Sequence, residues 1–169
     1  MHTRTSFPLI RTSLIALAVA GLAACTTTPP RGTPGQAAPN VNPTRPQQQF
    51  IRPAPGATIA RFNGQGNKGI DIAGNAGDPV RASADGRVVY VGGDLRGYGN
   101  MIIVKHNETF LTAYAHNQKV LVKEKDVVQQ GQQIAEMGSS GTDKVKLHFE
   151  IRKQGTAVDP EPYLSGRAR

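Results

Sequence analysis

The hydrophobic and polar positions alternate most regularly near the end of the chain, over residues 146–152. Successive side chains of an extended strand point to opposite faces. One face then carries three large apolar side chains, Leu147, Phe149 and Ile151. The other face carries four polar ones, Lys146, His148, Glu150 and Arg152. We expect a strand whose apolar face lies in a core and whose polar face opens to water or to a cleft.

Two side chains on that polar face, Lys146 and His148, project together about 6.5–7 Å apart along the strand. A His-x-His pair at this spacing is a common way for a strand to offer two imidazoles to one zinc ion. In this chain an ammonium group stands in place of the first imidazole. The pattern therefore indicates a metal-site strand with one imidazole replaced by a cation.

Short apolar stretches separated by turn residues fill the chain from about residue 61. They predict strands over 69–73, 80–83, 87–91, 101–104, 109–116 and 132–137. Asp85-Gly86 predicts a hairpin turn. In the strand over 109–116, alternation places Phe110, Thr112, Tyr114 and His116 on one face. Residues 120–130 predict at most one short turn of helix, so the pattern favours an all-β fold, an antiparallel sheet or sandwich.

Residues 1–24 predict a secretory signal peptide. Arg4 and Arg11 give a positive start, and residues 14–20 form an apolar run too short to span a bilayer. The run leads into Leu22-Ala23-Ala24-Cys25, which resembles a bacterial lipoprotein signal, cut before a cysteine that then carries the lipid. The alternative is an ordinary Ala-x-Ala cleavage site followed by an incidental cysteine.

Cys25 is the only cysteine of the chain, and it falls where lipidation requires it. We therefore expect Cys25 to be lipidated, which leaves no thiol for a disulfide or a nucleophile. Thr26 follows where lipoproteins retained in the inner membrane carry Asp, and its presence suggests sorting to the outer membrane, on the periplasmic face.

Residues 25–60 predict a disordered, proline-rich tether. Eight of the 12 prolines lie in residues 26–60, among many small polar residues and few large apolar ones. Such a segment cannot bury enough apolar surface to offset its ordering entropy. Fully extended it would reach about 110 Å, at about 3.1 Å per residue. It would let an anchored domain, residues 61–169, reach into the cell wall.

The net charge of +8 alone would suggest a nucleic-acid partner, but its distribution argues against one. Residues 1–60 contain five arginines and no acidic residue, whereas residues 61–169 hold 15 basic and 12 acidic residues, a net charge of +3. A solvated surface of mixed charge explains the domain better than nucleic-acid binding does.

Six short motifs resemble, in order, those of the LytM or lysostaphin-like zinc endopeptidases. They are Asn67-Lys68-Gly69-Ile70-Asp71, Ala84-Asp85-Gly86, Gly97-Tyr98-Gly99-Asn100, Tyr114-Ala115-His116, Gly131-Gln132-Gln133-Ile134 and Lys146-Leu147-His148-Phe149-Glu150. The resemblance covers about residues 60–165. It implies an antiparallel β fold with a groove for peptidoglycan peptides.

The resemblance places Asp71 and His148 at zinc-ligand positions and His116 at a catalytic position. Asn67 stands where the family has a ligand histidine, and Lys146 where it has a catalytic one. A carboxamide is a poor zinc ligand, three protein ligands are usual, and a nearby ammonium repels the ion. We therefore expect no metal, no cofactor and no catalytic residue, and interpret the domain as a degenerate, non-enzymatic one.

In place of the metal, we expect the Lys146 ammonium to pair with Asp71, because a carboxylate facing the cleft would otherwise lack a partner. Simpler interpretations exist for two of the other residues. His116 could be a packed histidine, and Asn67 could be a turn residue.

Degenerate outer-membrane lipoproteins of this family activate a periplasmic N-acetylmuramoyl-L-alanine amidase that splits septal peptidoglycan during daughter-cell separation. The resemblance implies this function here. We expect the amidase to dock in a groove walled by loops 92–99 and 138–143 and lined by Asn67, Asp71, His116, Lys146 and His148. Such proteins usually carry a LysM module, for which residues 26–60 are too short and too proline-rich. The alternatives are a peptidoglycan-binding module and a residual zinc endopeptidase.

Overall fold

Residues 48–168 are described by the computed structural model, and they form two antiparallel sheets. The larger sheet has the strand order β1-β2-β10-β6-β5-β4-β8, and β11 also pairs with β10. Its strands are β1 (Thr58–Ala60), β2 (Ile70–Ala73), β4 (Gly86–Gly92), β5 (Met101–Lys105), β6 (Phe110–Ala115), β8 (Val127–Val128), β10 (Lys146–Lys153) and β11 (Thr156–Val158). The smaller sheet, β3-β9-β7, contains β3 (Pro79–Arg81), β7 (Asn117–Val120) and β9 (Gln133–Met137).

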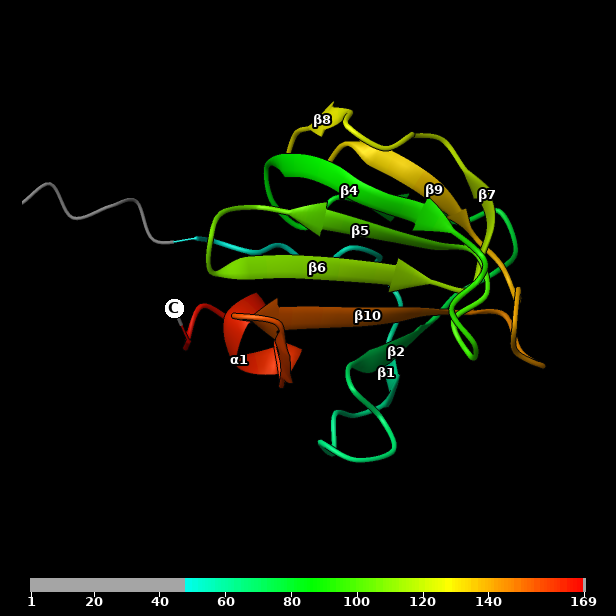
Figure 1. Ribbon diagram of the computed structural model, residues 1–169. Helices are drawn as coiled ribbons and strands as arrows, with labels where there is room; N and C mark the ends of the chain where they lie inside the picture. The colour runs from blue at the N-terminus through cyan, green and yellow to red at the C-terminus, as the bar shows by residue number, and fades with distance from the viewer. Residues whose placement is uncertain (1–47, 169) are drawn as a thin grey trace, which may run out of the picture. The chain divides into compact units, whose positions relative to one another are not determined.

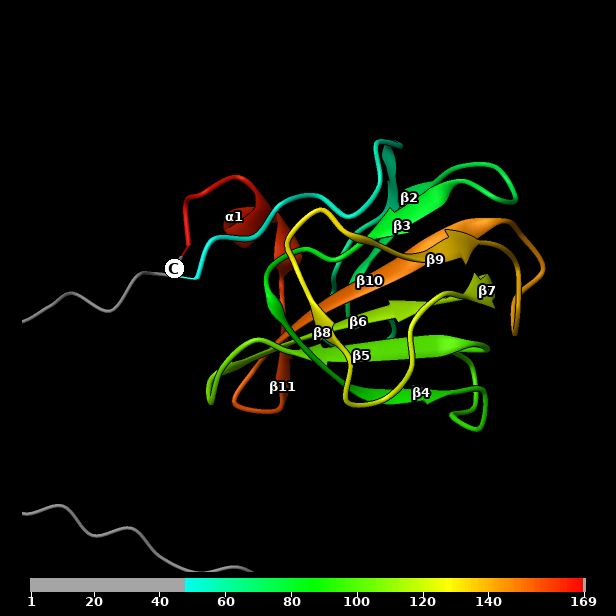
Figure 2. The same ribbon diagram turned by 90° about the horizontal axis from the view of Figure 1, so that it is seen from above.

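The main core lies between one face of the larger sheet and the smaller sheet. In Figures 1 and 2, the smaller sheet lies over the face formed by β4, β5, β6 and β10. Val80, Ile134 and Met137 of the smaller sheet join the same buried cluster as Tyr114 and Phe149 of the larger one. The opposite face of the larger sheet is therefore free to carry the polar groups of a site.

The apolar face of β10 forms the centre of this core, as its alternation predicts. Leu147, Phe149 and Ile151 are each 0% exposed. β10 also lies between β2 and β6, so its polar side chains have neighbours on both sides. The predicted all-β fold is confirmed, and each predicted strand has a counterpart within one or two residues at its ends. Two other features differ from the prediction, a turn and the start of the folded domain.

The first departure concerns the hairpin expected at Asp85-Gly86. β3 pairs with β9 in the smaller sheet, whereas β4 pairs with β5 and β8 in the larger one. The turn therefore carries the chain from one sheet to the other, and the hairpin prediction is wrong. A two-residue turn signal fixes the local backbone, but tertiary packing decides which strand pairs with which.

The second departure concerns the start of the folded domain, which precedes residue 61. Phe50 is 3% exposed and packs edge-on against Phe110, with ring centroids 5.5 Å apart. The Ile51 amide donates to the Ser83 carbonyl at 2.8 Å. Proline enrichment hid this segment because its few large apolar residues, Phe50 and Ile51, are widely separated from the next apolar stretch. The predicted signal peptide, Cys25 and residues 26–47 lie outside the described residues.

One short helix, α1 (Pro160–Leu164), follows β11 and was not predicted. Asp159 caps it by accepting a hydrogen bond from the Glu161 amide, and proline occupies its first turn. Tyr163 of this helix packs against Phe50 and Phe110. Within residues 48–168, no helix has the length and apolar character needed to cross a membrane.

Candidate functional site

The centre of the site is a cross-strand pair, Asp71 on β2 and His148 on β10, which lie opposite each other in the antiparallel register. Asp71 lies between Ile70 and Ile72, both 0% exposed, and so points to the opposite face of the sheet from these two core residues. The register therefore places a carboxylate beside an imidazole on the open face of the larger sheet.

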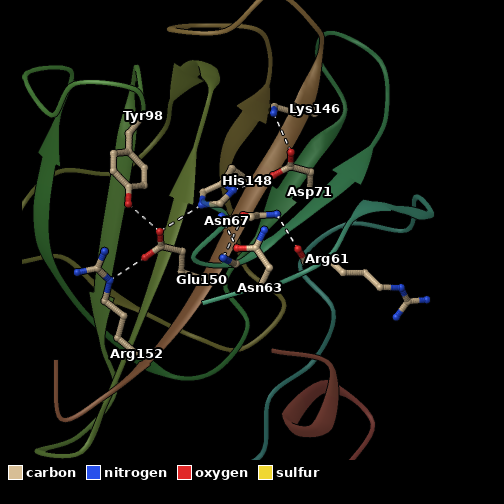
Figure 3. Close-up of polar contacts among 10 residues, drawn as sticks. Arg61, Asn63, Asn67, Asp71, Tyr98, Lys146, His148, Glu150 and Arg152 are labelled. Atoms are coloured by element: carbon tan, nitrogen blue, oxygen red, sulfur yellow. Dashed lines mark hydrogen bonds and ion pairs between the residues drawn. The ribbon is translucent and has the colours of Figure 1, made fainter. Parts of the chain in front are cut away.

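Each oxygen of the Asp71 carboxylate has a cationic or ring donor. Lys146 Nζ donates to Oδ2 at 2.7 Å, and His148 Nδ1 donates to Oδ1 at 2.7 Å (Figure 3). The predicted pairing of Lys146 with Asp71 is confirmed. Burial raises the pKa of Asp71, but the hydrogen bonds from His148 and Lys146 outweigh it and lower that pKa to about 2.

A second carboxylate, Glu150, extends this network along β10. Its side chain is 0% exposed, although the alternation predicted that it faces water or a cleft. Three side chains donate hydrogen bonds to it. Tyr98 Oη donates to Oε1 at 2.8 Å, His148 Nε2 to Oε1 at 3.2 Å, and Arg152 Nε to Oε2 at 2.7 Å. Burial raises the pKa of Glu150, but hydrogen bonds from His148, Arg152 and Tyr98 lower it to about 2.

Both ring nitrogens of His148 are thus directed at carboxylate oxygens. A carboxylate only accepts hydrogen bonds at neutral pH, so this arrangement favours the imidazolium form of the ring, in which both nitrogens donate. Burial lowers the pKa of His148, but the hydrogen bonds to Asp71 and Glu150 outweigh it and leave that pKa above its ordinary value. Figure 3 shows the resulting series, Lys146, Asp71, His148, Glu150 and then Arg152 or Tyr98.

Sequence reasoning missed Tyr98, Glu150 and Arg152 as members of this network. The signal was present for two of them, because alternation places Glu150 and Arg152 on the same face of β10 as His148. The third comes from the loop before β5, and no local pattern shows that Tyr98 reaches across to β10.

His116 lies immediately after β6, where the strand ends, and the change in backbone direction there brings its side chain to the site. Its φ is +67°, in the left-handed region that non-glycine residues seldom adopt. Tyr114 is in the core, yet the His116 ring lies 6.0 Å from the His148 ring on the open face. The expectation that His116 shares a face with Tyr114 is therefore wrong, because the left-handed residue ends the alternation.

Hydrogen bonds to two loops hold His116 in this conformation. Its amide donates to the Tyr98 carbonyl at 2.9 Å, and Nδ1 donates to the Ser140 carbonyl at 2.8 Å. Gly99 (φ +58°) allows these loops to touch, because a Cβ there would lie 2.1 Å from the Ser140 carbonyl oxygen. Burial lowers the pKa of His116, which favours a neutral ring.

Asn67 closes a turn beside the site. Its Oδ1 accepts from the Gly69 amide at 3.2 Å, and its Nδ2 donates to the Arg61 carbonyl at 3.1 Å (Figure 3). The simpler interpretation of Asn67 as a turn residue is thus confirmed, although its side chain also borders the cleft.

All five predicted residues, Asn67, Asp71, His116, Lys146 and His148, line one cleft of about 410 Å³. The rest of its lining comes from Ala60, Gly66, Lys68, Gly97 and Tyr98. Loop 92–99 thus forms one wall, as expected. Loop 138–143 does not line the cleft, and contributes instead through the Ser140 contact that holds His116.

This arrangement agrees with the comparison with known proteins. The model described as Peptidase family M23 matches residues 65–160, more than half of the chain. The chain belongs to peptidase family M23. The catalytic domain of the antimicrobial peptidase lysostaphin from Staphylococcus simulans has a similar fold, with a TM-score of 0.57 at 30% identity, covering 70% of this chain and 92% of that one.

Two curated relatives of this chain are named as a lipoprotein and as an activator. A "Lipoprotein NlpD/LppB homolog" from Pseudomonas aeruginosa is 61% identical over 117 residues, covering 68% of this chain and 39% of the relative. A "Murein hydrolase activator NlpD" from Escherichia coli is 56% identical over 117 residues, covering 68% of this chain and 31% of the relative. The chain thus spans well under half the length of either relative.

The zinc ion implied by an M23 peptidase does not fit the donors of this cleft. A zinc-ligand histidine offers a ring nitrogen with a lone pair, whereas both His148 nitrogens are directed at carboxylates, and Asp71 is already paired with the Lys146 ammonium. The family's other two site positions are occupied by Asn67, whose amide is engaged in a turn, and by Lys146, which carries an ammonium. Within the described part of the chain, no group of three or more His, Cys, Asp or Glu side chains is placed to hold a metal ion.

Proposed function

We propose that this chain is a non-enzymatic activator of a periplasmic N-acetylmuramoyl-L-alanine amidase, acting in septal peptidoglycan splitting and daughter-cell separation. The observation that carries the proposal is the set of hydrogen bonds that Asp71 and His148 make. In a zinc peptidase these two groups would supply lone pairs to the metal, whereas here they bind Lys146 and Glu150. The fold is retained, but the groups that hydrolysis needs are committed to one another.

The cleft then serves as a docking site for an element of the amidase. Docking favours the amidase conformer with an open active site, so activation is a shift in the populations of two conformers. The printed name "Murein hydrolase activator NlpD" of a relative 56% identical over 117 residues supports this direction. Lipidation of Cys25 would hold the chain at the periplasmic face of the outer membrane.

The experiment adds the full-length chain, purified in detergent, to each amidase of its own organism and measures release of dye-labelled fragments from isolated cell wall. We expect no release by the chain alone and a several-fold increase in release by one amidase. Lys146→Glu should reduce the stimulation while the thermal transition remains cooperative. Lys123→Glu, an exposed site outside the cleft lining, serves as the control.

Two results would overturn the proposal. One is a failure to stimulate any amidase of the organism. The other is release by the chain alone that depends on zinc and is abolished by His148→Ala, which would restore the endopeptidase alternative.

A further inference from the structure

The cleft carries more positive than negative charge at its surface. Its ionised lining residues, leaving the histidines aside, are Lys68, Lys146 and Asp71. Both oxygens of Asp71 already accept a hydrogen bond, one from Lys146 and the other from His148. These three side chains carry a net charge of +1, so a ligand meets two ammonium groups and one carboxylate that is already paired.

Both ammonium groups retain donors for a ligand. Lys146 Nζ has three N–H groups and spends one on Asp71 at 2.7 Å, while its side chain remains 21% exposed. Lys68 is exposed on the rim, next to the Asn67 turn, and it makes no ion pair with any side chain of residues 48–168. The cleft thus presents several donors and an excess of positive charge.

This charge selects between classes of ligand. A cationic side chain entering the cleft would meet two like charges and only one carboxylate, which is already paired, so the cleft disfavours it. A carboxylate can accept a hydrogen bond from either ammonium group, and such charge-assisted hydrogen bonds are stronger than neutral ones. The cleft volume of about 410 Å³ accommodates a side chain.

We propose that this cleft receives the carboxylate of an Asp or Glu side chain from the partner amidase, with Lys68 and Lys146 as its donors. The inference rests on the proposed function and names the chemistry by which the partner is recognised. Lys68 is the residue that tests it cleanly, since Lys146 also neutralises Asp71 and its loss changes the site itself.

The test measures the dissociation constant of the full-length chain and the amidase, and the stimulation of wall release, at low and high salt. We expect Lys68→Gln to weaken binding about two- to fivefold at low salt, the range of an exposed charge pair. Lys68→Glu should weaken it further, both changes should reduce the salt dependence, and Lys68→Arg should bind like the unchanged chain. The matched control is Lys123→Gln, an exposed lysine outside the cleft.

The outcomes separate the inference from the function on which it rests. Stimulation that persists unchanged in Lys68→Gln and Lys68→Glu, with binding insensitive to salt, overturns the inference and leaves the activator function standing. Loss of sedimentation with amidase-free cell wall in Lys68→Gln, without loss of amidase binding, assigns the carboxylate to wall peptides and also overturns it. An Asp→Lys or Glu→Lys change in the amidase that is rescued only by Lys68→Glu supports the pairing directly.

Discussion

At the scale of single residues, Lys146 decides what the neighbouring carboxylate can bind. Its ammonium lies 2.7 Å from Asp71 Oδ2 and, with His148 on the other oxygen, gives each carboxylate oxygen a hydrogen bond. The pairing could be predicted from the sequence because the family resemblance places both residues at one site, where the carboxylate would otherwise lack a partner. The contact between Tyr98 and Glu150 could not, since Tyr98 lies in a loop 52 residues away in the chain.

The Lys146–Asp71 pair is testable by a double-mutant cycle. Lys146→Met and Asp71→Asn each remove one partner from a pair whose side chains are only 21% and 11% exposed. We expect each single change to lower the free energy of unfolding, with a coupling energy of about 1–2 kcal/mol. Urea unfolding of the four proteins measures it, and strictly additive losses would show that the two groups do not interact.

Two histidines should titrate on opposite sides of the ordinary histidine pKa of 6.5. The pKa of His148 is raised by Asp71 and Glu150 against the effect of burial, whereas burial lowers the pKa of His106. His148 therefore contributes stability that is present at low pH and is lost as pH rises through its raised pKa. His106 contributes stability that is present above pH 6.5 and is lost as pH falls through its lowered pKa.

NMR titration of the imidazole signals, assigned with His148→Gln and His106→Gln variants, measures both values. A His148 pKa below that of His106 would contradict the assigned hydrogen bonds.

At the scale of elements, β10 connects the core to the cleft. The same eight residues place Phe149 in the core and His148 in the site, and neighbouring β2 and β6 fix their register. Alternation predicted this strand because one face lies in the core and the other carries the polar residues of the site. It failed at the end of β6, where His116 adopts a left-handed conformation that depends on contacts with two distant loops.

The buried face of β10 should be far more sensitive than the exposed loops. Phe149 is 0% exposed and contacts Tyr114, so Phe149→Ala leaves a cavity and should lower the free energy of unfolding by about 3–5 kcal/mol. Leu95→Ala, at a side chain 43% exposed, should change it by less than about 0.5 kcal/mol. Equal losses in chemical denaturation would place Phe149 outside the core.

At the scale of the whole molecule, the folded domain is larger than its composition suggests. Composition placed its start at residue 61, because prolines dominate the preceding segment. Tertiary contacts extend it to Phe50, whose ring packs against Phe110, His106 and Tyr163. Such contacts join segments far apart in the chain, and no local pattern reports them.

A chain that begins at residue 61 should accordingly be less stable than one that begins at residue 48. It lacks the buried Phe50 ring and β1, and we expect a loss of at least about 2 kcal/mol, the contribution of one buried phenylalanine. Thermal unfolding of the two fragments measures the difference in stability. Identical midpoints of unfolding would show that the folded domain begins at residue 61.

The central claim is that the cleft's own side chains have taken the donors that a metal would need. The most direct measurement is the zinc content of the purified chain after equilibration with one equivalent of zinc and removal of the free ion. The account predicts well under one zinc per chain, unchanged in His148→Ala. One tightly held zinc per chain, lost in His148→Ala, would contradict it.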